Sequence, residues 1–116
     1  MSYDLTIRAD DQYKGATSKK LLAAFLNALP DVKSNGPSGF VLDVPNKRWM
    51  EIDLEVVDED GDNIENAGEE CSEINCLRLH IPYGFLNPDS FEKDYLSTAK
   101  VIADFVGWTL IDEQTD

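Results

Sequence analysis

The chain has 116 residues, of which 42% are hydrophobic and 28% are charged, so we expect a single globular domain spanning residues 1–116. Its formal net charge of −13 argues against a surface that neutralises phosphates, and we expect no nucleic acid and no membrane among its partners. Residues 1–50 carry a net charge of +2 and residues 51–116 carry −15, which favours a basic partner for the second half.

The beginning of the chain and its cysteines indicate a cytoplasmic protein. The first residues, MSYDLTIRADD, contain neither the basic nor the apolar region of a signal peptide. No apolar run approaches the ~20 residues that a membrane span needs. In the absence of an export signal, we expect Cys71 and Cys76 to be free thiols.

The first quarter of the chain predicts one strand and one helix. Residues Tyr3–Arg8 alternate between apolar and polar side chains, as a strand with one buried face does. Residues Lys19–Leu29 carry leucines and a phenylalanine at helical spacing, with Thr17-Ser18 before them as an N-cap and Pro30 after them as a stop. The segments on either side of this helix are expected to be loops.

The longest period-2 pattern in the chain lies at Arg48–Val57, where apolar residues alternate with Glu51, Asp53 and Glu55. We expect a strand with one apolar face and one face of carboxylates. A preceding strand, Phe40–Val44, joins it through the three-residue turn at 45–47. This loop length places Leu42 opposite Met50 and Phe40 opposite Ile52, so that the apolar residues share one face.

The second half predicts an acidic loop at Asp58–Glu73, a strand, a helix and a short final strand. In the strand Ile74–Pro82, the residues Leu77, Leu79 and Ile81 are expected to face inward, and Cys76, Arg78 and His80 outward. The helix is expected to run from Pro88 or Asp89 to Val106, with Gly107 just past its end, and the final strand covers Trp108–Ile111.

The predicted order β-α-β-β-β-α-β describes an α+β fold. Two helices on one face of a mostly antiparallel sheet form a two-layer sandwich. The first β-α-β unit is compatible with the split crossover of ferredoxin-like folds, with one additional strand.

The two ends of the chain, MSYDLTI and IADFVGWTLIDEQT, resemble small uncharacterised bacterial proteins. Those proteins open with MSYDL and close on an ADF-GW-DEQ segment. The resemblance covers about a quarter of the chain and implies a bacterial cytoplasmic protein, with no assigned function and no site residues.

The outward face of the carboxylate strand is the candidate site. If Leu54 lies opposite Leu79, then Glu55 faces Arg78 and Asp53 faces His80. The general expectation for such pairs is cross-strand ion pairing, worth about 0.2–1 kcal/mol each. A sharper hypothesis makes His80 a general base oriented by Asp53, although the sequence offers no nucleophile or oxyanion donor to complete such a site.

Two groups of residues resemble metal sites incompletely, and we expect neither a metal nor another cofactor. Counted from Asp58, the residues Asp60, Asp62 and Glu69 match acidic positions of an EF-hand loop, but Asn63 replaces the required glycine.

A zinc site built from Cys71, Cys76 and His80 would lack a fourth ligand, and the spacing matches no known zinc pattern. Most isolated cysteines and histidines have structural roles instead.

We therefore predict a non-catalytic acidic protein-binding module, for example an immunity-type protein that neutralises a basic toxin or nuclease. The alternative is a small enzyme or ligand-binding protein that uses the outward face around His80. A third hypothesis, a homodimer through this face, brings like charges together, so we expect a monomer or a weak dimer. The predicted partner face comprises Trp49, Glu51, Asp53, Glu55, Asp58, Asp60, Asp62, Arg78 and His80.

Overall fold

The computed structural model of the chain describes residues 2–36, 38–62, 64 and 72–112. The strands are β1 (Ser2–Arg8), β2 (Thr17–Ser18), β3 (Val32–Ser34), β4 (Gly39–Val44), β5 (Arg48–Glu55), β6 (Glu73–Ile74), β7 (Cys76–Pro82) and β8 (Thr109–Asp112). The helices are α1 (Lys19–Asn27) and α3 (Ser97–Val106), with a 3-10 turn η1 (Tyr83–Phe85) and a π-helical turn η2 (Glu92–Leu96).

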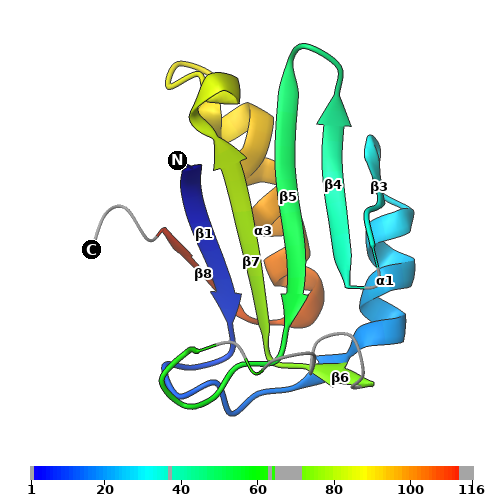
Figure 1. Ribbon diagram of the computed structural model, residues 1–116, viewed down its shortest axis with the longest axis vertical. Coiled ribbons are helices and arrows are strands. Elements are labelled where there is room, and N and C mark those ends of the chain that lie inside the picture. Colours follow the sequence, from blue (N-terminus) through cyan, green and yellow to red (C-terminus); the bar gives the residue numbers. More distant parts are fainter. Residues whose placement is uncertain (1, 37, 63, 65–71, 113–116) are drawn as a thin grey trace.

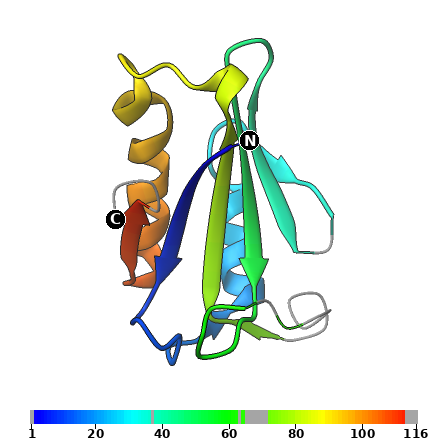
Figure 2. The same ribbon diagram turned by 60° about the vertical axis from the view of Figure 1, so that its left-hand side comes forward.

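Six strands form one antiparallel sheet in the order β3-β4-β5-β7-β1-β8, and both helices cover the same face of it (Figures 1 and 2). This confirms the predicted two-layer α+β sandwich. The four strands β5-β7-β1-β8, with α1 following β1 and α3 preceding β8, have the split β-α-β arrangement of ferredoxin-like folds. The hairpin β3–β4 extends the sheet beyond β5, so two strands are added instead of the one predicted. Within the described residues, no helix is long and apolar enough to cross a membrane.

The core lies between the sheet and the helices, and the predicted inward faces are confirmed. Leu54 of β5 and Leu79 of β7 are at most 1% exposed, and so are Leu22 of α1 and Ile102 of α3. The register between β4 and β5 is also as predicted, with Leu42 opposite Met50 and Phe40 opposite Ile52. Ser18 caps α1 by accepting a hydrogen bond from the Leu21 N–H.

Several short elements differ from the sequence prediction. The predicted loop after α1 contains β3, a three-residue edge strand that pairs only with β4. The two-residue strands β2 and β6 pair with each other below the main sheet. The predicted second helix begins with the π-helical turn η2, whose Tyr95 is fully buried and donates a hydrogen bond to the Phe85 carbonyl, 2.6 Å away. Elements this short carry too few residues to show a hydrophobic period.

The side chain of Asn75 joins two loops at one end of the sheet by hydrogen bonds. Its side-chain oxygen accepts from the Val57 N–H, and its side-chain nitrogen donates to the carbonyls of Val57 and Tyr13. The segment that follows β1 and the segment that follows β5 are thereby held together. A Cβ added to Gly61 would meet the Tyr13 hydroxyl at 2.9 Å, so the two loops pack closely there.

Candidate functional site

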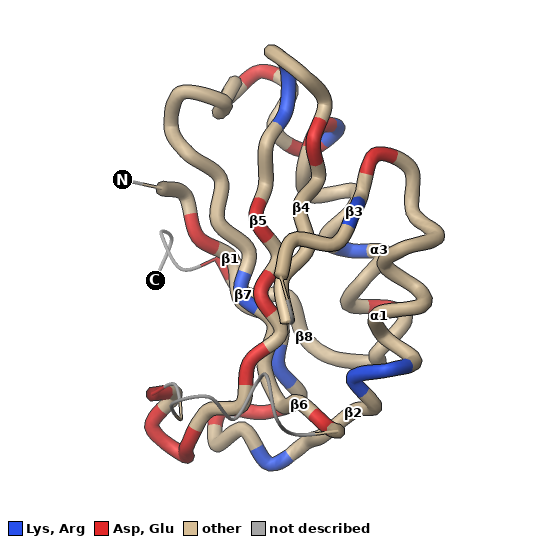
Figure 3. The backbone as a smooth tube through the Cα atoms, turned by 45° about the vertical axis from the view of Figure 1, so that its right-hand side comes forward, with Lys and Arg blue, Asp and Glu red and all other residues tan. Residues whose placement is uncertain are grey.

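The predicted partner residues lie together on the face of the sheet opposite the helices, which we call the outer face. Trp49, Glu51, Asp53 and Glu55 project from β5, and Arg78 and His80 project from the neighbouring β7. Asp58, Asp60 and Asp62 follow in the loop below β5. Figure 3 shows Asp and Glu along β5, near the start of β1 and in this loop. We call Glu51, Asp53, Glu55 and the loop 58–62 the acidic face.

The predicted register between β5 and β7 is wrong by two residues. Leu54 pairs with Leu77 instead of Leu79, and Asp53 therefore lies directly opposite Arg78. A slip of two residues keeps every side chain on its face, so alternation alone could not distinguish the two registers. The predicted ion pairs still form, as diagonal contacts: Arg78 Nε lies 3.4 Å from Glu55 Oε1, and His80 Nε2 lies 3.5 Å from Asp53 Oδ2.

His80 lies between two carboxylates, of which only Asp53 was predicted. Its Nδ1 is 2.8 Å from Asp4 Oδ1, a shorter contact than the one to Asp53. Burial disfavours ionisation of Asp4, but hydrogen bonds from Ser2 and His80 outweigh it and keep the pKa of Asp4 below its usual value. The Ser2 hydroxyl donates to Asp4 and not to His80, so it is not placed as a nucleophile activated by the imidazole.

Asp4 also lines a cleft of about 350 Å³ in the outer face. The walls of the cleft carry both signs of charge, since Asp4 and Asp60 face it together with Arg78, and the imidazole of His80 lies beside them. Thr6 and Tyr13 complete the polar lining. Sequence reasoning missed Asp4 because the strand order was unknown: alternation places Asp4 outward, but only the pairing of β1 with β7 brings it to His80.

Arg78 and Glu55 form a half-buried pair beneath the loop 58–62. Their side chains are 32% and 14% exposed, and Arg78 also donates to the Gly61 carbonyl. Burial raises the pKa of Glu55, and the nearby Arg78 only partly offsets this effect. Cys76, predicted to face outward, does lie on this face but is fully buried, and burial raises the pKa of its thiol.

The part of the acidic loop that resembles a calcium loop forms a hydrogen-bonded turn. Asp58 Oδ1 accepts the N–H groups of Asp60 and Asp62, at 2.9 and 3.0 Å. Gly61 closes the turn with a φ of 85°, a conformation that favours glycine. Asp58 therefore shapes the loop, whereas the side chains of Asp60 and Asp62 are not needed for the turn itself.

Both metal hypotheses reach outside the described residues, since Asn63, Glu69 and Cys71 are not among them. Across the part of the chain that the structure describes, no cluster of three or more His, Cys, Asp or Glu residues is arranged to hold a metal ion. Cys76 and His80 are four residues apart on one strand, roughly 13 Å at the usual rise, so they cannot share an ion.

Trp49 lies on the outer face at the end of β5 that is remote from the loop 58–62. It pairs with Asp43 of β4, and its side chain is half-buried. Trp49 is six positions before Glu55, which corresponds to roughly 20 Å along the strand. The described part of the acidic loop therefore does not cover the indole ring.

The raised pKa of Glu55 predicts how stability changes with pH. Because burial raises this pKa, and that of Asp53, the folded state binds these protons more tightly than the unfolded chain. The contribution of each group to stability is fully present below its ordinary pKa, 4.5 for Glu55 and 3.8 for Asp53, and is lost as the pH rises through the raised pKa of the folded state. We expect the urea midpoint to rise when the pH is lowered from about 7 to about 5, and to rise less in Glu55→Gln.

Glu92→Gln is the matched control for this experiment, because its side chain is 79% exposed. Its pH dependence should follow the wild type. A Glu55→Gln protein whose midpoint shifts with pH as the wild type does would show that Glu55 titrates normally.

The chain was also compared with models of protein families, with curated proteins and with solved structures, and no significant match was found in any of the three. The resemblance of the two chain ends to small bacterial proteins therefore stays a prediction.

Proposed function

We propose that the protein is a non-catalytic, cytoplasmic binding module that engages a basic protein through its acidic face. The observation that supports this most directly is the surplus of unpaired carboxylates there. Within the described residues, Glu51, Glu59, Asp60 and Asp62 have no ion-pair partner, whereas Asp4, Asp43, Asp53 and Glu55 each have one.

The dimensions of this face suit a protein partner. Trp49 and Glu55 lie roughly 20 Å apart along β5, and a standard interface covers about 800 Å² on each side. An aromatic anchor beside a charged, hydrated surface is a common arrangement in such interfaces. Neutralisation of a basic toxin or nuclease, by covering its active cleft, is the concrete function that this arrangement fits.

Affinity capture at low salt tests the proposal. The wild-type protein should retain one basic partner in near-stoichiometric amount, and added salt should release it. The decisive comparison is a variant with Glu51→Gln, Asp60→Asn and Asp62→Asn, which should lose the partner. A variant with Asp89→Asn, Glu92→Gln and Asp104→Asn removes the same charge from α3 and the segment before it, and should keep the partner. Equal retention by both variants would contradict the proposal.

The same two variants predict the association kinetics. Because opposite charges steer the encounter, the acidic-face variant should associate with the captured partner about tenfold more slowly at low salt. The control variant should differ from the wild type by less than about threefold, since its charges lie away from the contact. Stopped-flow measurement across a salt series checks this: the difference should vanish at high salt, and an on-rate indifferent to salt would contradict steering.

Trp49 is expected to act on dissociation instead. Truncating an aromatic hot-spot residue costs about 2 kcal/mol or more, so Trp49→Ala should raise the off-rate about thirtyfold or more. Phe105→Ala is the control, because Phe105 is 47% exposed and lies in α3, on the opposite face of the sheet. A Trp49→Ala protein that folds normally and dissociates at the wild-type rate would remove Trp49 from the interface.

The second candidate function is binding or conversion of a small ligand around His80. The cleft lined by Asp4, Arg78 and His80 favours it, because polar groups of both signs converge there. The two candidates differ in the capture experiment, since a small-ligand protein would retain no stoichiometric protein partner.

A further inference from the structure

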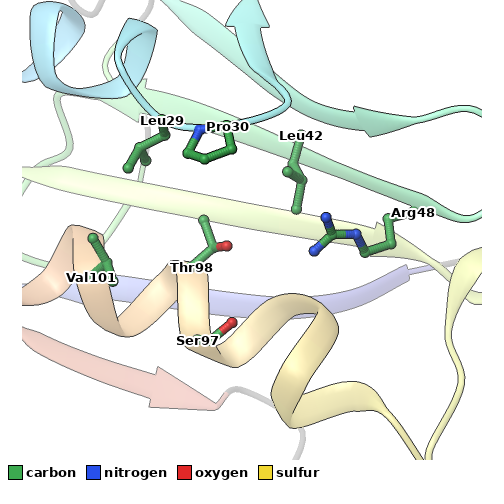
Figure 4. Close-up of a pocket in the computed structure, with 7 residues that line it drawn as sticks. All are labelled: Leu29, Pro30, Leu42, Arg48, Ser97, Thr98 and Val101. Atoms are coloured by element: carbon green, nitrogen blue, oxygen red, sulfur yellow. The ribbon is translucent and has the colours of Figure 1, made fainter.

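A second concave site lies on the opposite side of the sheet, between α1 and α3 (Figure 4). Its volume is about 270 Å³, close to the lower end of the range for small-molecule sites. Leu42 of β4 forms its floor, and Leu29, Pro30 and Val101 form its apolar walls. This groove shares no residue with the acidic face.

One end of the groove is polar and cationic. Arg48 points to the helix side of the sheet because it follows the same alternation as the buried Met50. Figure 4 shows its guanidinium and the Thr98 side chain directed toward each other at this end. Of the five N–H donors of the guanidinium, one is used at 3.0 Å by the Asp94 carbonyl and a second makes a long, 3.5 Å contact with Asp31 Oδ2. Further donors remain for a planar anion.

The other end of the groove is apolar. Leu29 and Val101 lie there in Figure 4, and Val101 is 46% exposed. Beyond them the rings of Phe25 and Phe105 stack at a centroid distance of 4.0 Å and join the two helices. From Thr98 to Phe105 α3 rises about 10 Å, which limits the length of an apolar chain lying in the groove.

We propose that this groove binds a medium-chain aliphatic monocarboxylate. The carboxylate lies against Arg48 and Thr98, because a guanidinium recognises a planar carboxylate with two parallel hydrogen bonds. The aliphatic chain lies over Leu42 between Leu29 and Val101, where it removes apolar surface from water. The long Arg48–Asp31 contact yields to the stronger pair with the ligand.

Titration with octanoate, followed by assigned NMR spectra of the whole chain, tests the proposal. The shifts should be confined to Leu29, Leu42, Arg48, Thr98 and Val101. Octanol and octylamine, which have the same chain length, should bind at least about tenfold more weakly because they lack the anionic group. Octanol binding as tightly as octanoate, or shifts spread over all exposed apolar residues, would overturn the proposal.

Two variants with opposite expected effects sharpen the test. Arg48→Met keeps the apolar stem and should weaken octanoate binding about tenfold or more. Asp31→Asn removes the competing carboxylate and should tighten binding about threefold. Asparagine also tolerates the left-handed backbone of residue 31, whose φ is 62°. Asp62→Asn makes the same charge change on the acidic face and should leave the affinity unchanged, and an equal gain there would overturn the proposal.

If Arg48→Met does not fold, Val101→Phe provides the loss of function, because it narrows the groove while keeping Arg48. Unchanged octanoate affinity in Val101→Phe would overturn the proposal. Sedimentation of the protein without ligand tests whether a second copy of the chain fills the groove instead. A dimer whose formation shifts the NMR signals of these same residues would show that it does, and would overturn the proposal.

Discussion

Leu54→Ala is expected to lower the free energy of unfolding by about 3–5 kcal/mol, among the largest effects of any single truncation in this protein. Leu54 is 1% exposed and pairs with Leu77, which is fully buried. The sheet on one side and the helices on the other restrict collapse around the missing methyl groups. A cavity therefore remains in addition to the lost transfer free energy.

The matched control lies three residues earlier on the same strand. Glu51→Ala changes an outer-face side chain that has no ion-pair partner within the described residues, so its effect should stay within about 0.5 kcal/mol. Urea denaturation at about pH 7, with equal slopes for both variants, gives the comparison. Similar midpoints for Leu54→Ala and Glu51→Ala would mean that the two faces of β5 are reversed.

The alternation of hydrophobic and polar residues made the inward and outward faces of β5 predictable from the sequence. Hydrophobic residues at alternate positions of β1, β4, β5 and β7 define an inward face whichever strands are neighbours. The three-residue turn between β4 and β5 then fixes one register, because Leu42 and Phe40 have to meet Met50 and Ile52. Local sequence thus determined the faces of the strands and one pairing between them.

Relations between distant segments were not predictable in this way. The segment between β5 and β7 is too long for its length to set a register, and inward Leu residues at both 77 and 79 satisfied the pattern equally. For the same reason the contact of Asp4 with His80 remained hidden, since it joins residues 76 positions apart. Alternation along β5 places Arg48 on the inward face of the strand, but its position in a groove depends on how α1 and α3 pack over the sheet.

Arg78→Met is the second large effect, with an expected loss of about 2–3 kcal/mol. Removing one partner of a fully buried ion pair typically costs about 3–5 kcal/mol, because the other charge is left without compensation. We lower that value because Arg78 is 32% exposed and water screens part of the interaction. The variant also loses the hydrogen bond from Arg78 to the Gly61 carbonyl, which holds the loop 58–62 to the sheet. This hydrogen bond is worth about 1 kcal/mol or more.

A double-variant cycle separates these two contributions. Combining Arg78→Met with Glu55→Gln removes the uncompensated carboxylate, so the double variant should recover about 1–2 kcal/mol relative to Arg78→Met alone. The remaining loss then reports the missing contact with Gly61. Arg8→Met is the control: within the described residues Arg8 contacts the Tyr13 ring and hydroxyl and no carboxylate, so its truncation leaves no uncompensated charge behind.

The pH dependence of the Arg78→Met loss provides an independent check on its cause. Without the guanidinium, the main influence that offsets the effect of burial on Glu55 is lost, and the pKa of Glu55 should rise further above its ordinary value. Protonation then relieves the uncompensated charge, so the loss should be smaller at about pH 5 than at about pH 7. A loss that is equal at both pH values, and is not recovered by Glu55→Gln, would show that Arg78 stabilises the fold through the loop alone.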